Sequence, residues 1–250
     1  MTTVTESTRV FFSFPEVRDG RHEAYNAWHQ LDHLPENRAL PGVLHGERWV
    51  RTPECREAAD VDEEPTLSGA QYVAMYWFRE PAPASIDEWL ALGESTRQAG
   101  RRPELAWTTR RLTGFFEPEH GHVDPAARVS LAALPFRPAR GVVLEAHRVD
   151  DPDAALRQAE RLSVTATLPG VTGSWSFLGR RVTLTPPDDG RSDLGEPGRL
   201  RLTVHWCEAD PVEVVRWIAA GAPAGPGATL LLRTPLRTIT PWQWDWFDRA

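Results

Sequence analysis

The chain has 250 residues, of which 41% are hydrophobic, and a mean hydropathy of −0.42, values typical of a globular protein and not of a disordered one. Its formal net charge of −7 disfavours binding to nucleic acid, because that requires a basic surface against the phosphates. Every basic residue is an arginine, so a Schiff-base lysine and the lysine of a phosphate-binding P-loop are both excluded.

The cysteines and the start of the chain give no sign of secretion. Cys55 and Cys207 lie far apart, without the spacing of a disulfide framework or a zinc knuckle. Residues 1–8 lack the basic start and apolar core of a signal peptide, and no apolar run elsewhere is long enough to cross a bilayer. We therefore expect a cytoplasmic protein that binds neither nucleic acid nor a membrane.

The first half begins with an apolar run typical of a strand at 10–14, followed by a helix that carries Trp28 and ends near Pro35. Ser85, with Glu88 three positions later, predicts the start of a second helix. After the turn at 40–43, the remaining predicted elements are a strand at 47–50, a polar loop at 52–69, a strand at 72–78, a helix at 85–98 and a strand at 107–116.

The second half repeats this order. The turn sequence Leu-Pro-Gly-Val at 40–43 recurs at 168–171, a shift of 128 positions, and an apolar strand precedes each copy. Asp210 as N-cap and Pro211 at the first helical position predict a helix start. The predicted elements here are strands at 142–146 and 174–177, a loop at 185–199, a strand at 200–206, a helix at 210–220 and a strand at 229–239.

Each half therefore has the order β-α-β-β-α-β, which predicts an α+β fold of two ferredoxin-like repeats. Proline, glycine and small residues at 121–138 mark the junction, so we expect one repeat at 1–125 and the other at 126–250. In this fold both helices cover one face of a four-stranded sheet. The strands are apolar on both sides, so the bare face of each sheet must also be buried, and the other repeat is the natural cover.

The stretch 25–42 has the pattern Tyr-x2-Trp-x4-His-Leu-Pro-x4-Leu-Pro-Gly, and it resembles the dimeric α/β-barrel superfamily, in particular EthD-like and antibiotic-biosynthesis-monooxygenase-like proteins. The resemblance implies that the two repeats pack sheet to sheet as a pseudo-dimeric α/β barrel within one chain. The superfamily includes cofactor-independent isomerases, polyketide cyclases, quinone-forming monooxygenases and some haem enzymes, so the resemblance leaves the reaction open.

The second repeat has lost the polar residues of this stretch. At the shift of 128, His29, Asp32 and His33 correspond to Arg157, Glu160 and Arg161. Pro35 and Glu36 likewise correspond to Ser163 and Val164. We therefore expect one functional site, located in the first repeat, and a degenerate site in the second.

Three residues of the first helix are the candidate catalytic groups: Asp32, His33 and His29. At 100° per residue, Asp32 falls within about 60° of Trp28, on the face expected to be buried. Pro35 disfavours helical geometry just before it, which places His33 in the terminal turn near a pocket mouth. His33 can then act as a general acid or base near neutral pH, with Asp32 orienting it and His29 assisting.

Structural roles are also open for these residues. His33 can be a cation favoured by the helix dipole, Asp32 a buried hydrogen-bond acceptor and His29 a surface residue. His29 and His33 have the i, i+4 spacing of metal ligands, and Glu36 and His45 could add to them. A histidine pair alone is weak evidence, so we expect no metal and no cofactor.

Aromatic residues of the first repeat are the candidate substrate-binding groups: Tyr25, Trp28, Tyr72, Tyr76 and Trp77. Polar residues within strands of the second repeat predict an inter-sheet network or a second polar pocket: Glu145, His147, Arg201, Thr203 and His205. Near the C-terminus Trp242, Trp244 and Trp246 alternate, so in an extended segment their rings lie on one side and either anchor the terminus or cover a pocket.

These observations favour an enzyme that uses histidine acid/base chemistry, without a cofactor, on a small hydrophobic molecule of aromatic or polyketide-like character. Isomerisation, cyclisation, dehydration and oxygenation all fit. One alternative is a protein that binds haem or a hydrophobic metabolite without catalysis, and another is a non-catalytic partner of an enzyme. We expect a monomeric pseudo-dimer or a homodimer.

Overall fold

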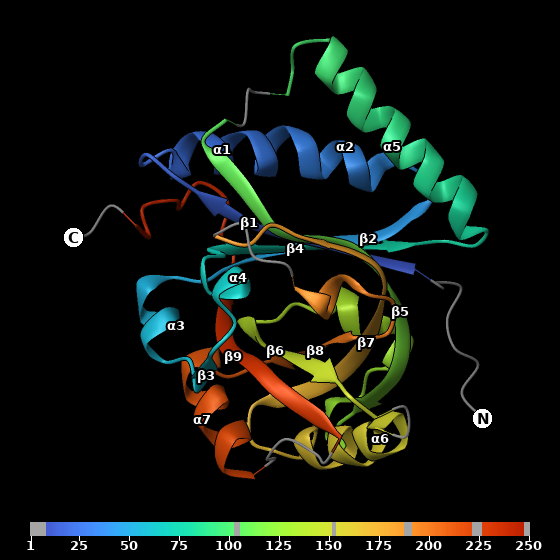
Figure 1. The fold of residues 1–250 in the computed structure, drawn as a ribbon, viewed down its shortest axis with the longest axis vertical. Coiled ribbons are helices and arrows are strands. Elements are labelled where there is room, and N and C mark those ends of the chain that lie inside the picture. The colour runs from blue at the N-terminus through green and yellow to red at the C-terminus, as the bar shows by residue number, and fades with distance from the viewer. Residues whose placement is uncertain (1–8, 103–105, 152–153, 188–191, 222–226, 248–250) are drawn as a thin grey trace.

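The computed structural model describes residues 9–102, 106–151, 154–187, 192–221 and 227–247, and Figure 1 shows how their helices and strands are arranged. The first half contains β1 (Arg9–Val17), α1 (His22–Trp28), a π-helical turn (His29–His33), α2 (Leu34–Ala39), β2 (Val43–Val50), α3 (Pro53–Glu57), β3 (Val61–Asp62), α4 (Pro65–Ser68), β4 (Tyr72–Phe78), α5 (Ala82–Gln98) and β5 (Thr108–Val123). Two 3-10 turns (Pro125–Ala127 and Leu131–Phe136) lead to β6 (Gly141–Val149), α6 (Ala154–Thr165), β7 (Val171–Leu184), a 3-10 turn (Asp193–Gly195), β8 (Leu200–Cys207), α7 (Pro211–Gly221) and β9 (Ala228–Thr238).

The strands form one large antiparallel sheet that closes on itself. Its order is β2-β4-β1-β5-β7-β8-β6-β9, and β9 pairs back with β2, while β3 is added beside β9. The four strands of the first half are thus neighbours, as are the four of the second, and the halves join at β5–β7 and β2–β9. Helices α1, α2 and α5 lie on one side of the barrel, and α6 and α7 lie on the opposite side (Figure 1).

The inside of the barrel is a single apolar core to which both halves contribute. Alternate side chains of β1, such as Val10 and Phe12, point into it, so their neighbours face the helices. The tryptophans of this core are Trp49, Trp77, Trp175 and Trp206, and phenylalanines such as Phe116 and Phe177 pack among them. Every residue of β4 is buried, because one of its faces lies on this core and the other lies under the helices. This explains why the strand is apolar throughout.

Several helices and loops begin or end at residues other than those predicted. Helix α5 begins at Ala82, three residues before Ser85, whose hydroxyl donates to the Arg79 carbonyl from within the helix, so the prediction of Ser85 as N-cap was wrong. Asp210 does cap α7, since its carboxylate accepts the Val212 amide at 2.9 Å. The predicted loop 52–69 holds two short helices and β3. Residues 1–8, residues 188–191 of the loop 185–199, and the side chain of Arg157 lie outside the described part of the chain.

The C-terminal aromatic residues do not share one side. Phe247 stacks on His22, with ring centroids 4.1 Å apart, and Trp246 packs on the cluster that contains Tyr25. Trp242 has a positive φ of 70° and is 74% exposed, and it stacks on Trp244. The end of the described chain is therefore anchored to the first half by Trp246 and Phe247. Among the described residues, no helix combines the length and the apolar character needed to span a bilayer.

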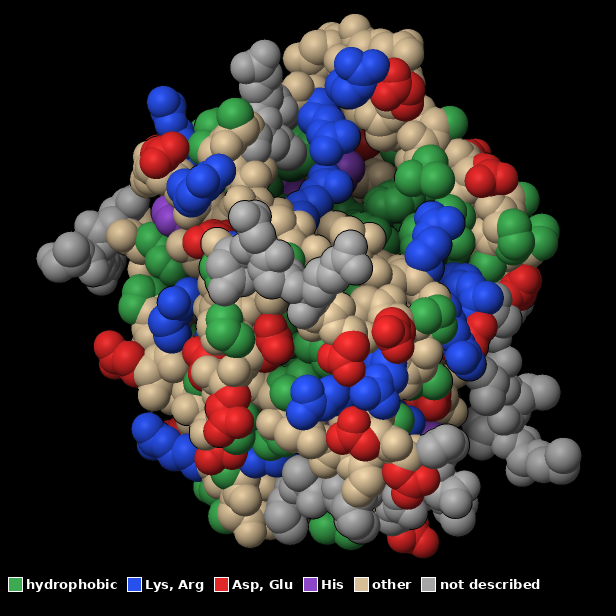
Figure 2. Space-filling view, viewed as in Figure 1, with side chains coloured by type: hydrophobic (Ala, Val, Ile, Leu, Met, Phe, Trp, Pro, Cys, Tyr) green, Lys and Arg blue, Asp and Glu red, His purple; other side chains and the backbone are tan. Residues whose placement is uncertain are grey.

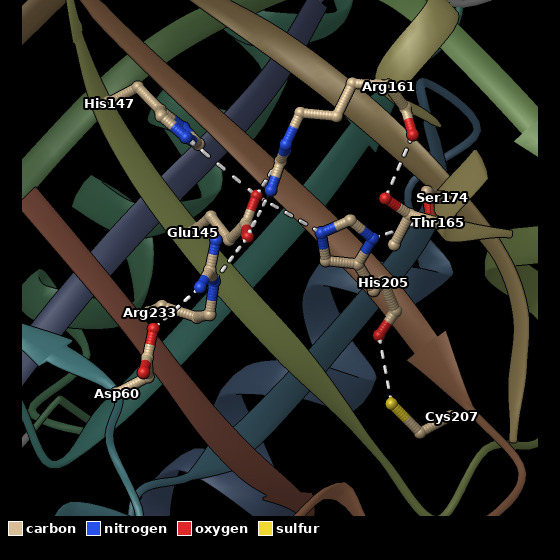
Figure 3. A network of polar contacts seen from close by, with 9 residues as sticks. All are labelled: Asp60, Glu145, His147, Arg161, Thr165, Ser174, His205, Cys207 and Arg233. Atoms are coloured by element: carbon tan, nitrogen blue, oxygen red, sulfur yellow. Dashed lines mark hydrogen bonds and ion pairs between the residues drawn. The ribbon is translucent and has the colours of Figure 1, made fainter. Parts of the chain in front are cut away.

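Of the polar strand residues predicted in the second half, Glu145, His147 and His205 belong to a buried network, which Figure 3 shows at close range. Arg201 pairs instead with Glu119 at 2.7 Å. Glu145 is fully buried, and its two oxygens accept hydrogen bonds from Arg161 of α6 at 2.6 and 2.7 Å. Arg233 of β9 donates to Glu145 at 2.7 Å and to Asp60 at 2.6 Å. His205 lies 3.4 Å from the same carboxylate. The network thus joins the outer face of the barrel to α6, not one sheet to another.

The charges in this network balance each other. Burial alone would raise the pKa of Glu145, but Arg161 and the nearby histidines outweigh it and hold this pKa well below its ordinary value. Burial lowers the pKa of His147 to about 4, although Glu145 opposes the shift. Glu145 is therefore ionised and His147 neutral near neutral pH, and ion pairs lie between α6 and the barrel.

We expect Trp77→Ala to lower the free energy of unfolding by about 3–5 kcal/mol, because it opens a cavity in the barrel core. Chemical denaturation measures the change. The control is Trp242→Ala, whose side chain is 74% exposed and which should change stability by no more than about 0.5 kcal/mol. Equal effects of the two substitutions would contradict the placement of Trp77 in the core.

We expect Glu145→Gln to destabilise the fold by about 3–5 kcal/mol, because two buried arginines lose their shared counter-ion. Glu208→Gln is the matched control, since Glu208 pairs with Arg137 at the surface and should contribute less than about 1 kcal/mol. Urea denaturation of the two variants at pH 7 makes the comparison. A loss below about 1 kcal/mol for Glu145→Gln would show that the buried charges are stabilised by other groups.

Candidate functional site

A cavity of about 240 Å³ lies between the outer face of the first-half strands and the helices that cover them. It is lined from β1, β4 and the start of β5 on one side and from α1, the π-helical turn, α2 and α5 on the other. Figure 2 shows basic side chains running down into a hollow beside α5, with histidine and hydrophobic side chains deeper in it. Its aromatic lining consists of Phe11, Tyr25, Trp28, Tyr76 and Trp89.

Strand alternation decides which side chains reach the cavity. Phe11 and Ser13 of β1 face it, whereas Phe12 between them lies in the barrel core. Tyr76 of β4 faces it too, and its ring lies against Gly46 of β2. A Cβ atom at position 46 would come within 2.7 Å of the Tyr76 ring, so glycine is required there for the tyrosine to take this place.

The candidate histidines lie on the π-helical turn, between α1 and α2. His33 stacks on Trp28, with ring centroids 4.8 Å apart and an interplanar angle of 23°, and it meets His29 edge to face at 4.8 Å. Both histidines line the cavity. A π-helical turn adds a residue to the turn and often occurs at functional sites. Here it brings residues 28, 29 and 33 together as one aromatic and imidazole cluster.

Two expectations about this helix were wrong. Asp32 does not point inward: its carboxylate accepts hydrogen bonds from Arg101 at 2.9 and 3.0 Å on the outer surface. The buried face is centred on Tyr25, Asn26 and His29, two of them polar, so hydropathy placed its centre too close to Trp28. The helix also does not end before Pro35. The π-helical turn already interrupts the α-helical hydrogen bonds, and the proline is accommodated in the first turn of α2.

The aromatic candidates divide into two groups. Tyr25, Trp28 and Tyr76 line the cavity, as predicted for substrate-binding residues. Trp77 does not, because it lies on the opposite face of β4 in the barrel core. Tyr72 lies beneath α1, where its hydroxyl accepts a hydrogen bond from Asn26 at 2.9 Å, and it is not part of the cavity lining.

Three arginines make the site positively charged, and none of them was predicted as a site residue from the sequence. Arg48 is fully buried, lies over the rings of Tyr25 and Tyr72, and donates to Asn26 and Gln30. Within the described part of the chain it forms no ion pair. Arg102 and Arg110 line the cavity itself. The signal that could have found Arg48 is a charged residue inside the apolar alternation of β2.

The histidines are held in the neutral form. Burial, together with the nearby charges of Arg110, Arg102 and Arg48, lowers the pKa of His33 from its ordinary value of 6.5 to about 3. Burial is also the main reason why the pKa of His29 lies well below its ordinary value, with Arg48 contributing. Desolvation and cations act in the same direction, because both disfavour an imidazolium. His33 is therefore an uncharged imidazole over the whole physiological pH range.

Tyr25 and Tyr76 keep their protons. Burial raises the pKa of both hydroxyls, and the opposing charge of Arg48 does not cancel this effect. Asn37 lies close enough to Tyr76 to favour the ionised form, but the two side chains make no hydrogen bond of normal geometry. The Tyr76 hydroxyl is thus a buried donor on the cavity wall that a bound molecule can satisfy.

A metal site at the histidine pair lacks ligands. Glu36 pairs with Arg101 at 2.7 Å on the surface, and His45 lies beside Phe136 in a separate groove. The described residues contain no cluster of three or more potential metal ligands. The cavity thus combines aromatic walls, two neutral histidines and two arginines, Arg102 and Arg110, with the buried Arg48 close to the histidines. This arrangement is suited to proton transfer and to stabilising negative charge.

The sequence matches no model of a known protein family and no curated protein. Solved structures do match over nearly the whole chain. One is an anthrone oxidase-like protein, with a TM-score of 0.50, 9% identity and coverage of 96% of this chain and 94% of that one. Another is a dye-decolorizing peroxidase from Bacteroides thetaiotaomicron, with a TM-score of 0.53, 8% identity and coverage of 94% of both chains.

An encapsulated DyP-type peroxidase from Mycobacterium smegmatis is similar as well, with a TM-score of 0.51, 10% identity and coverage of 96% of this chain and 95% of that one. At such low identity these likenesses concern the fold alone. The chain therefore has the dimeric α+β-barrel fold, built on ferredoxin-like sheets, that these structures share.

Proposed function

We propose that the protein is an enzyme that moves a proton on a small aromatic substrate, with His33 as the base. The observation that carries the proposal is a neutral histidine, stacked on Trp28, that lines an aromatic cavity beside three arginines. Its ring nitrogens form no hydrogen bond with the described residues, so they are free to accept a proton. His29, whose Nδ1 is buried without a partner, is the auxiliary group.

The arginines make the proton transfer depend on the substrate. In the empty cavity they oppose an imidazolium at His33. When a substrate gives up its proton, the negative charge that it acquires offsets the arginines and stabilises the imidazolium that forms. The imidazolium form of His33 is thus favoured only as the reaction proceeds, which is the condition for catalysis by electrostatic stabilisation. Asp32 is not part of this site, because it pairs with Arg101.

The size of the cavity limits the substrate. An engineered cavity of about 150 Å³ holds one benzene molecule, so a cavity of about 240 Å³ suits one or two fused rings. A haem, with four pyrrole rings around its iron, is too large for this space. The reaction needs no cofactor in this proposal, and enolisation, isomerisation and oxygenation of a ring carbonyl or phenol all begin with such a proton transfer.

We also propose that the chain is a fused pseudo-dimer, with one repeat at 1–125 and the other at 126–250. The matching strand orders of the two halves support this division. In the second repeat Arg161 occupies the sequence position that corresponds to His33 in the first, and it forms a buried ion pair with Glu145. One site per chain follows, and the barrel is closed without a second chain, which favours a monomer.

Arg110→Gln should raise the pKa of His33 from about 3 toward its ordinary value of 6.5, because a cation that opposes the imidazolium is removed. Imidazole NMR signals followed from pH 7 to pH 3 report this pKa. Arg101→Gln is the control, since Arg101 pairs with Asp32 and Glu36 outside the cavity and should leave the pKa unchanged. Equal titration of His33 in the wild type and in Arg110→Gln would contradict the electrostatic model.

His33→Asn should slow proton abstraction by about 10²–10⁴-fold, the usual contribution of a positioned base. The probe is 2-tetralone, a two-ring ketone with acidic hydrogens, whose exchange in deuterated water is followed by NMR. His45→Asn is the matched control, because burial also lowers the pKa of His45, to about 4, in a groove away from the cavity. An exchange rate with the wild type no faster than in buffer, or full activity of His33→Asn, would contradict the proposal.

A further inference from the structure

We propose that Arg102 and Arg110 form a carboxylate-binding subsite at the cavity and that the natural substrate is an aromatic carboxylate. The inference rests on the proposed function, which it makes more specific by naming the class of substrate. Two guanidinium groups line one small aromatic cavity, and neither is paired with an acidic side chain in the part of the chain that the structure describes.

Two arginines beside the cavity have acidic partners. Arg101 binds Asp32 and Glu36, and Arg97 binds Glu94 at 2.5 and 2.8 Å. The two arginines on the cavity differ from them in position as well as in pairing, because they share their surroundings with aromatic rings and neutral histidines.

The acidic side chain on the described cavity wall, Glu94, forms no ion pair with either arginine, although its charge acts on Arg102. Glu94 already accepts hydrogen bonds from Arg97 and from Gln98 at 2.8 Å. Burial lowers the pKa of Arg102, and the charge of Arg110 adds to the effect, so the two cations lie close enough to repel each other. A bound anion would remove this repulsion.

A carboxylate is the anion that fits best. It is planar and accepts paired hydrogen bonds from a guanidinium, a geometry that a spherical ion cannot use. The rest of the cavity is lined by rings such as Trp28 and Trp89, which require an apolar and flat body. A molecule with one or two fused rings and one carboxylate satisfies both parts of the site.

Such a ligand would also complete the proposed mechanism. The arginines keep His33 uncharged in the empty cavity, and a carboxylate on Arg102 and Arg110 would cancel that effect. His33 would then become a stronger base only when the substrate is in place. The subsite would therefore couple recognition of the substrate to further activation of the base, so an uncharged analogue should still lose its proton, but more slowly than a carboxylate.

The test compares 2-naphthoate with 2-naphthamide, which has the same shape and no charge, by isothermal titration calorimetry. We expect the wild type to bind naphthoate at least about tenfold more tightly, the factor that corresponds to 1.4 kcal/mol. Arg102→Gln and Arg110→Gln should each abolish most of this preference, and Arg101→Gln should retain it. Naphthoate should also raise the pKa of His33 in NMR titrations of the wild type, and much less in Arg110→Gln.

Equal affinity for the two probes, absence of naphthoate binding up to millimolar concentration, or an equal loss in Arg101→Gln would overturn the subsite. These outcomes are separate from the role of His33. His33→Asn should still prefer naphthoate, and the exchange of uncharged 2-tetralone tests the base without any carboxylate. A protein that accelerates that exchange but shows no preference for naphthoate would keep the proposed function and lose this inference.

Discussion

Closure of the sheet is the constraint on which the rest of the structure depends. Because β9 pairs back with β2, one face of every barrel strand is committed to a common apolar core. The other face lies outside, under helices, and any cavity for a ligand must form there. The location of the site is therefore a consequence of topology, and the choice of side chains on the outer face decides what each half can do.

The two halves use that outer face in opposite ways. Under α6, a carboxylate at Glu145 lies between Arg161 and Arg233, so the charges compensate each other. Under α1 and α5, Arg102 and Arg110 form no ion pair with the described residues, and a cavity remains between aromatic rings. Buried charge is costly in both places, and the second half offsets this cost with its own residues. In our proposal, a bound anion offsets it in the first half.

The sequence predicts elements better than it predicts which way their side chains face. Strand 72–78 and the Asp210 cap were found where they were expected, because unbroken apolar runs and capping residues are local signals. The inward direction predicted for the Asp32 side chain was wrong, because the buried face of the helix is polar and the π-helical turn changes the register of the helix. Arg48, Arg102 and Arg110 come from three separate segments, and only the folded chain brings them to one cavity.

The two joints that close the barrel are unequal. Strands β5 and β7 pair along residues 112–123, whereas β2 meets β9 only at Trp49 and Val50. Side chains reinforce the short joint, since Arg51 donates to Thr234 at 2.9 Å and the connection between β2 and β4 supplies Asp60 to Arg233. That connection therefore stabilises the shorter joint with side-chain hydrogen bonds. We expect local opening of the barrel to start at this joint, because fewer backbone hydrogen bonds close it than close the long one.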